Sequence, residues 1–209
     1  MMSKSFHIET YSGKFIDPTA PKPDDICIED IAWALSRIAR FTGHSRSVIP
    51  YTVAEHSVLV YDLMTDYLAG KDYPGLNVER EELTFSEKNN VLFHALLHDA
   101  HEAYIGDIST PLKRIPALGA IVHEMTVKLD CVIFERFGLT PLTYYQLRAL
   151  KFLDLYALAI ESDILMPSGG KGPFWNLPVL ETTPSKRVPS ILSSENALNL
   201  FMSAFANIS

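Results

Sequence analysis

The sequence predicts an all-α fold, a helical bundle with a small N-terminal β-hairpin and a loop rich in proline and glycine before its last helix. Apolar residues recur every three or four positions through most of the chain, which is the spacing of one helix face. Only the first sixteen residues contain the short extended runs typical of strands. With 209 residues, 47% of them hydrophobic, the chain is long enough for one sizeable core. We therefore predict a single domain over residues 1–209.

The two ends of the chain depart from the helical pattern. Residues 6–16 form two short extended runs around Ser12-Gly13, which predicts the hairpin. Residues 167–189 hold five prolines and three glycines, which predicts a loop. The apolar spacing of residues 190–208 predicts a terminal helix, so the C-terminal region 167–208 consists of this loop and this helix. Three apolar side chains of the helix are expected to point inward: Leu198, Phe201 and Phe205.

Between these ends, about residues 28–165 form the predicted core of the bundle. The apolar spacing predicts five helices, over residues 28–41, 52–68, 87–104, 117–137 and 140–165. The second begins at a capping box, Thr52-x-x-Glu55, the fourth is closed by Gly138, and the fifth begins at Thr140-Pro141. Residues 70–86 and 106–116 contain proline and are predicted to be loops.

Composition excludes several classes of function. The formal net charge of −7 argues against a protein that follows a nucleic-acid backbone, although a local cluster of basic residues and a metal can still bind a free nucleotide. The start of the chain has no apolar stretch of signal-peptide length, and nowhere do about eighteen apolar residues follow one another. We expect a cytoplasmic protein that binds neither nucleic acid nor membrane. Because Cys27 and Cys131 are the only cysteines, a metal site must use nitrogen and oxygen ligands.

The pair His98-Asp99, together with His56 and Asp154, is the strongest candidate for such a site. Two imidazoles and two carboxylates can hold one divalent metal, and this mixed set suits Mn²⁺, Co²⁺, Fe²⁺ or Zn²⁺ better than Mg²⁺. His56 follows the capping box in the opening turn of its helix. Adjacent helix residues point about 100° apart, so His98 and Asp99 reach one ion only at the helix edge.

The alternative is that these residues are ordinary core or surface residues. A lone histidine on a helix is more often a satisfied polar residue than a ligand. The apolar residues 91–97 and the leucines around Asp154 weigh against this alternative, because a carboxylate there is costly unless it is paired or metal-bound. Asp154 could still pair with an arginine or a hydroxyl, and Asp130 and Asp163 are rival ligands.

His56, His98-Asp99 and Asp154 also match the H…HD…D signature of the HD-domain phosphohydrolases. The stretches 53–57, 98–107 and 110–113 resemble the bacterial 5′-deoxynucleotidase branch of that superfamily, which phage deoxynucleoside triphosphate hydrolases also resemble. The similarity covers roughly residues 28–163. It implies an HD-domain helical bundle in which His56, His98, Asp99 and Asp154 are the metal ligands.

The resemblance also implies roles for residues around the metal. Glu102, one turn after Asp99 on the same predicted helix, would handle the proton of the attacking water, and Asp107 matches a further acidic position, although it could merely order its turn. Arg40-Phe41 resembles an Arg-aromatic pair that holds phosphate and base. Arg46 and Lys113 are further phosphate candidates, or solvated charges on loops. His101 could bind the substrate or lie exposed on the surface.

These residues predict a metal-dependent phosphohydrolase that acts on deoxyribonucleotides with one divalent cation per site. The expected reaction is the release of phosphate from a deoxynucleoside monophosphate. One alternative is the release of triphosphate from a dNTP such as dATP, and a second is a nucleotide-binding protein without turnover. By analogy with the related nucleotidases, we expect a homo-oligomer.

Overall fold

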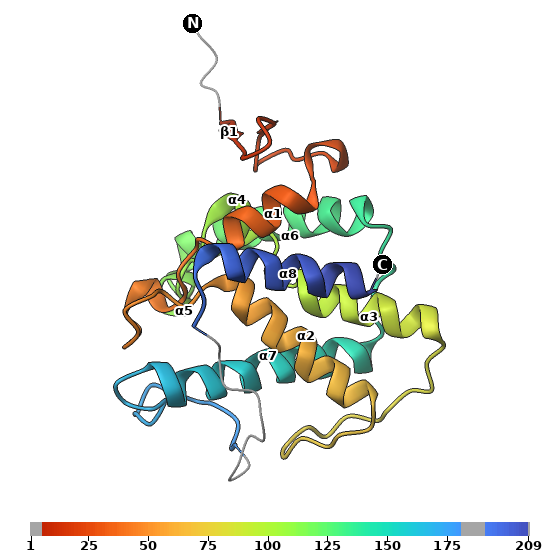
Figure 1. Ribbon diagram of the computed structural model, residues 1–209, viewed down its shortest axis with the longest axis vertical. Coiled ribbons are helices and arrows are strands. Elements are labelled where there is room, and N and C mark those ends of the chain that lie inside the picture. Colours follow the sequence, from red (N-terminus) through yellow and green to blue (C-terminus); the bar gives the residue numbers. More distant parts are fainter. Residues whose placement is uncertain (1–5, 181–190, 209) are drawn as a thin grey trace, which may run out of the picture.

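The computed structural model describes residues 6–180 and 191–208 of the chain. Helices make up most of the described residues, and a two-stranded antiparallel sheet precedes them (Figure 1). This arrangement confirms the predicted all-α fold with a small N-terminal hairpin. None of the helices in the described ranges is long and apolar enough to cross a membrane. The single-domain assignment stays a prediction.

The hairpin pairs β1 (Ile8–Glu9) with β2 (Phe15–Ile16). Ile8 lies opposite Ile16, and the turn is closed by a hydrogen bond from Thr10 N to Lys14 O of 2.8 Å. Gly13 has a φ of 82°, a left-handed conformation that glycine adopts without the strain of a side chain. Ile16 is fully buried and attaches the hairpin to the core.

The first predicted helix, 28–41, is wrong at its C-terminal end. Helix α1 (Ile28–Leu35) ends six residues earlier, and a short 3-10 turn, η2 (Arg40–Gly43), follows it. Backbone pairing with the residues before the next helix replaces the expected last turn, because Arg40 N donates to Tyr51 O and Val53 N donates to Ile38 O. This long-range pairing has no signal in the local apolar spacing.

Helix α2 (Val53–Leu68) begins at its predicted capping box, whereas the predicted helix 87–104 is wrong in its second half. Helix α3 (Phe85–Leu97) ends before His98, and α4 (Glu102–Ile105) is a separate turn. Between them the backbone hydrogen bonds join residues three apart, such as Ala100 N to Leu97 O at 3.0 Å. These tighter turns carry no proline or glycine, so composition did not predict the break.

The remaining helices follow the prediction except at three points. They are α5 (Thr110–Lys113), α6 (Pro116–Arg136), α7 (Tyr144–Leu165) and α8 (Ser194–Ile208). Helix α5 lies inside the predicted loop 106–116. Helix α7 begins after the capping box of Thr143 rather than at Thr140-Pro141, because the backbone of Thr140 is bound by the side chain of Asn90. The described part of the predicted Pro/Gly loop, 167–180, has no helix or strand, and its remainder lies outside the described residues. The helix expected over residues 190–208 begins only at Ser194, since the described residues 191–193 are not helical.

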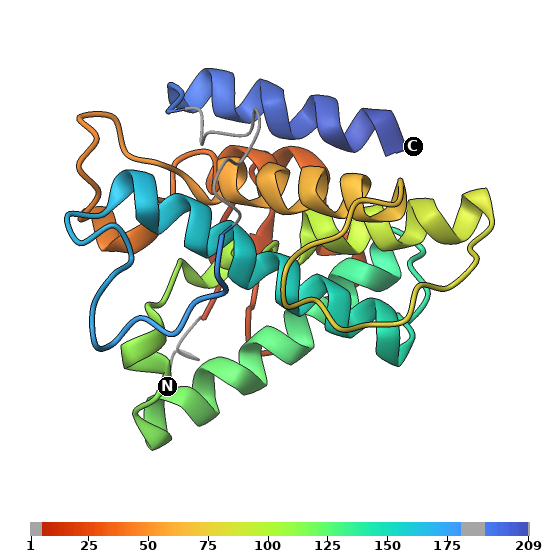
Figure 2. The ribbon, with the colours of Figure 1, turned by 90° about the horizontal axis from the view of Figure 1, so that it is seen from below.

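Helix α2 is the centre of the packing and contacts α3, α7 and α8. Helix α8 packs over α1, α2 and α3 (Figures 1 and 2), with Phe201 fully buried and Leu198 and Phe205 packed against the core as predicted. Two hydrophobic clusters share α2, one reaching α1 and α8 and the other reaching α3 and α7. His56 lies on α2 among the residues that contribute to the first of these clusters.

Candidate metal centre

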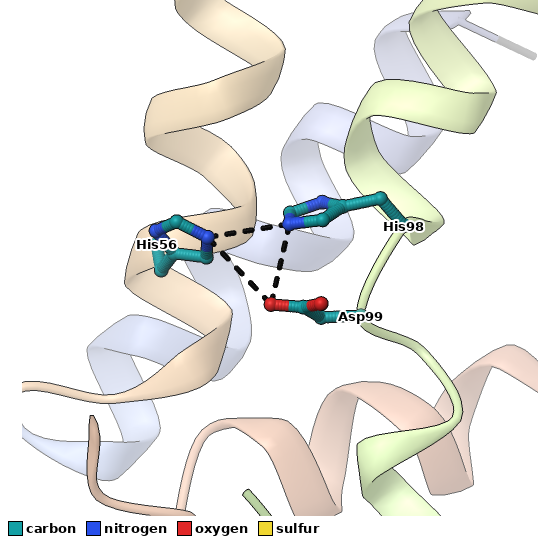
Figure 3. A group of neighbouring side chains, drawn as sticks. All are labelled: His56, His98 and Asp99. Carbon is teal, nitrogen blue, oxygen red and sulfur yellow. Dashed lines mark hydrogen bonds and ion pairs between the residues drawn. The ribbon is translucent and has the colours of Figure 1, made fainter. Parts of the chain in front are cut away.

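Three of the predicted ligands meet between α2 and the turn that follows α3 (Figure 3). His56 projects from the first turn of α2, while His98 and Asp99 follow the last residue of α3. The two imidazole Nε2 atoms lie 3.2 Å apart. The Oδ2 atom of Asp99 lies 3.2 Å from His98 Nε2 and 3.6 Å from His56 Nε2. The adjacent residues His98 and Asp99 thus both face this point from the start of the tight turn after α3.

Asp154 brings a fourth donor from the middle of α7. Its Oδ1 atom lies 3.1 Å from His56 Nε2 and 3.8 Å from His98 Nε2. Donors about 2.1 Å from one ion are about 3.0–3.5 Å apart when they are neighbours in a tetrahedral or octahedral shell. The separations of 3.1 to 3.8 Å between the two imidazole nitrogens, and between these and the two carboxylates, are close to this range, so the group could hold one divalent cation.

The four candidate ligands are buried to different degrees. The His56 side chain is fully buried, and those of His98 and Asp99 are 12% and 19% exposed. The Asp154 side chain is 40% exposed. The cluster is therefore enclosed by protein on the His56 side and open to solvent on the Asp154 side.

Both imidazoles are held through the nitrogen that faces away from the cluster. His98 Nδ1 lies 2.9 Å from Ala95 O, and His56 Nδ1 lies 2.6 Å from Glu161 Oε1. The carbonyl and the carboxylate accept these bonds, which places a proton on Nδ1, so the Nε2 atom of each imidazole, when neutral, presents its lone pair to the cluster. This is the usual arrangement of metal-binding histidines.

Glu161 is a site residue that the sequence reasoning missed. It is fully buried on α7, in the apolar run that continues from Asp154, and its pKa is lowered below the ordinary value. Burial alone would raise that pKa, but the positive charge of Arg40 and the hydrogen bond with His56 outweigh it. Its position seven residues after Asp154, two helical turns along the same face, is the signal that could have identified it.

Arg40, a predicted phosphate-binding residue, lies against the cluster. Its Nε and NH2 atoms are each 3.2 Å from Glu161 Oε2, and its NH1 atom is 3.7 Å from Asp99 Oδ2. The neighbouring Phe41 has a left-handed φ of 55°, which is strained for a residue with a bulky side chain, and its ring centroid lies 5.7 Å from the Arg40 guanidinium carbon.

Glu102 lies beside the cluster, although on a separate turn and not on the helix of His98 as predicted. Only 3% of Glu102 is exposed, and its Oε2 atom has no hydrogen-bond partner among the described residues. Its Oε1 atom lies 3.7 Å from the Nζ atom of Lys113. Burial, with the nearby carboxylates of Asp99 and Asp107, raises the pKa of Glu102 to about 9.

Three more candidates have defined partners. His101 is buried, not surface-exposed, and its Nδ1 atom lies 3.0 Å from Asp130 Oδ1, so that rival ligand is engaged by His101. Arg46 lies at the end of α7, where its guanidinium donates to Pro167 O at 2.7 Å. The other rival, Asp163, is about half exposed and lies 3.9 Å from Lys171 Nζ.

The charges of the cluster favour a cation. Burial alone would lower the pKa of His98, but the carboxylates of Asp99 and Asp154 outweigh it and raise the pKa to about 10. Burial alone would raise the pKa of Asp99, but His98, His56 and Arg40 hold it well below the ordinary value. Two ionised carboxylates thus draw a positive charge into a largely buried site, which a divalent ion would supply.

Fold and site together define a helical protein with a candidate metal centre of two histidines and two aspartates. No family model matches the chain. The chain is 36% identical to the uncharacterized protein YfdR of Escherichia coli (strain K12) over 204 residues, which cover 97% of this chain and 95% of YfdR. It is also 36% identical, over 153 residues, to an uncharacterized protein of Rhodobacter capsulatus, covering 73% of this chain and 69% of that protein. The chain therefore belongs to the same family as YfdR.

Proposed function

We propose that the chain is an HD-domain phosphohydrolase that uses a divalent metal to release phosphate from 5′-deoxynucleoside monophosphates. The observation that carries this proposal is the convergence of His56, His98, Asp99 and Asp154 on one point. These residues come from three separate segments of the chain, which are α2, the turn after α3, and α7. The resemblance of residues 98–107 to the deoxynucleotidases supplies the substrate class.

The residues around the cluster have the chemistry that phosphoester hydrolysis needs. An ion held by the four ligands would lower the pKa of a water molecule and neutralise phosphoryl charge. Arg40, which faces Asp99 through NH1, would bind a phosphoryl oxygen. The exposed side of Asp154 gives the substrate access to the cluster.

Glu102 would manage the protons. Because its pKa is raised to about 9, its carboxyl group is protonated at neutral pH and can donate to the 5′ oxygen as the P–O bond breaks. The water oxygen forms the new bond to phosphorus, and a proton released by that water restores Glu102. Lys113, 3.7 Å away, would stabilise the carboxylate in the interval.

A monophosphate is favoured over a triphosphate by the number of available cations. A triphosphate carries more charge and needs several basic side chains beside the metal. Arg40 already pairs with Glu161 and Asp99, and Arg46 donates to the carbonyl of Pro167. Lys113 adds one more basic side chain, which lies beside Glu102.

The test is to incubate the purified protein and Mn²⁺ or Co²⁺ with deoxynucleoside mono- and triphosphates and to identify the product by phosphorus NMR. We expect orthophosphate from monophosphates, with turnover lost in the His98→Ala, Asp99→Ala double variant and kept in His123→Ala, which changes an exposed residue of α6. Tripolyphosphate from dATP or dGTP would instead identify the triphosphate reaction. Absence of any hydrolysis would overturn the proposal in favour of nucleotide binding without turnover.

A further inference from the structure

The two carboxylate oxygens of Glu161 bind two different residues of the site. Oε1 lies 2.6 Å from His56 Nδ1, and Oε2 lies 3.2 Å from both Nε and NH2 of Arg40. The Glu161 side chain is completely buried, as is that of His56. A buried carboxylate is costly unless it is paired and hydrogen-bonded, and here both oxygens are satisfied by these two partners.

The contact with His56 determines which imidazole nitrogen can bind a metal. An ionised carboxylate only accepts hydrogen bonds, so His56 Nδ1 carries the proton and Nε2 presents its lone pair. That Nε2 atom is the one that lies 3.2 Å from His98 Nε2 and 3.1 Å from Asp154 Oδ1. The other imidazole tautomer would direct a proton at the cluster instead.

The contact with Arg40 determines where the guanidinium points. With Nε and NH2 on Glu161 Oε2, the NH1 atom is directed toward Asp99 Oδ2, 3.7 Å away. The Arg40 side chain is only 12% exposed, so it has little room for another orientation. Because Arg40 follows the end of α1 and His56 begins α2, Glu161 joins two separate segments from one position on α7.

We propose that Glu161 is a positioning residue that holds His56 in the metal-binding tautomer with one carboxylate oxygen and aims Arg40 at the substrate phosphate with the other. The first half needs only that the cluster binds a metal. The second half rests on the proposed function. Glu161 touches neither the metal nor the substrate, and it links the two through its partners.

The test is the Glu161→Gln variant of the full chain. Glutamine has the same shape but one acceptor oxygen, so it cannot accept from both partners, and its amide group faces either His56 Nδ1 or Arg40. We expect Co²⁺ affinity, measured by calorimetry, to fall by about 10-fold to 100-fold. The visible absorption bands of bound Co²⁺ should also change, and Glu161→Asp, which keeps the charge, should recover part of the affinity.

Two other variants separate positioning from general loss of structure. Glu55→Gln alters another buried glutamate, which caps α2 and accepts from Leu192 N. Its side chain has no hydrogen bond to the His56 imidazole among the described residues, so this variant should leave Co²⁺ affinity near that of the parent. Arg40→Gln should raise KM for the nucleotide, because it removes the guanidinium that faces Asp99 while keeping the contact between Glu161 and His56. Circular dichroism would verify that each variant is folded. If Glu161→Gln does not fold, the Co²⁺ titration is made with Glu161→Asp instead.

Failure of this inference is distinguishable from failure of the proposed function. If Glu161→Gln binds Co²⁺ as the parent does, with unchanged absorption, the positioning role is overturned even when the parent hydrolyses nucleotides. The parent could instead hydrolyse no nucleotide while Glu161→Gln loses Co²⁺ affinity. The role of Glu161 toward His56 then stands, whereas the proposed function and the role of Glu161 toward Arg40 are overturned. Equal losses of Co²⁺ affinity in Glu161→Gln and Glu55→Gln would also overturn the positioning role of Glu161, because they would indicate a general effect on the structure.

Discussion

Asp154 is the candidate ligand whose removal disturbs the fold least. Its side chain is 40% exposed, whereas His56 is fully buried, so truncating Asp154 removes little packed surface. From the sequence alone, Asp163 on the same helix is a rival ligand. The structure separates the two, because Asp154 lies 3.1 Å from His56 and Asp163 pairs with Lys171.

We therefore expect Asp154→Ala to lower Co²⁺ affinity by at least about 10-fold while keeping the helical circular dichroism spectrum of the parent. Asp163→Ala is the matched control and should leave the affinity unchanged. Calorimetric titration of the two variants measures both effects. Weakened binding in Asp163→Ala with normal binding in Asp154→Ala would show that the ligand set is wrong.

His94 gives a pH dependence that is independent of the metal. Its Nε2 atom lies 2.9 Å from Thr140 O, and burial lowers its pKa below the ordinary value of 6.5. The unfolded chain therefore takes up a proton as the pH falls through 6.5, while the folded protein keeps His94 neutral. This residue's contribution to stability is present above that pH and lost below it.

The expected result is a smaller loss of unfolding free energy between about pH 7.5 and about pH 5 in His94→Gln than in the parent. Glutamine can still donate to Thr140 O but does not titrate. Urea unfolding at the two pH values measures the difference, and His123→Gln, at an exposed position, should behave as the parent does. Equal losses in the parent and in His94→Gln would contradict the assignment.

How much of the site could be predicted depends on whether a residue's role is visible in its own segment. His56, His98, Asp99 and Asp154 were predicted because polar metal-ligand types stand in apolar helical stretches. The role of Glu161 depends on His56 and Arg40, which lie 105 and 121 residues away along the chain. A partnership of that kind becomes visible only when the segments are placed in space.

At the scale of elements, helix ends were predicted where local chemistry determines them. The start of α2 follows from Thr52 and Glu55, which bind each other and are both buried. The ends of α1 and α3 were not predicted, because backbone pairing with Tyr51 and tight turns after Leu97 override the apolar spacing. His98 and Asp99 lie at the second of these departures.

The Thr52 cap should contribute more to stability than an equivalent exposed cap. Thr52 Oγ1 lies 2.7 Å from Glu55 Oε2 in a buried site, and Thr84 makes the same contact with Glu87 on the surface of α3. Replacing a capping threonine with alanine costs about 0.5–2 kcal/mol. We expect Thr52→Ala near the upper value, because the buried Glu55 loses a partner, and Thr84→Ala near the lower one. Urea denaturation measures both, and the reverse order would contradict the argument.

At the scale of the whole molecule, the candidate metal centre joins segments that are distant in the chain. His56 and His98 are 42 residues apart, and Asp154 lies on a third helix. These donors come together only in the folded chain, where α2, the turn after α3 and α7 lie side by side. An ion bound there stabilises the native state and has little affinity for the unfolded one.

Metal binding should consequently raise the melting temperature of the protein. Free metal at 100 times its dissociation constant adds about 2.7 kcal/mol to the free energy of unfolding when one ion binds the folded state alone. Thermal unfolding with increasing Co²⁺ should show this shift, and a chelator should reverse it. The His98→Ala, Asp99→Ala double variant should not respond, whereas His123→Ala should respond as the parent does. The double variant lacks two of the four candidate ligands. If its melting temperature rises as much as that of the parent, Co²⁺ binds at another place on the protein.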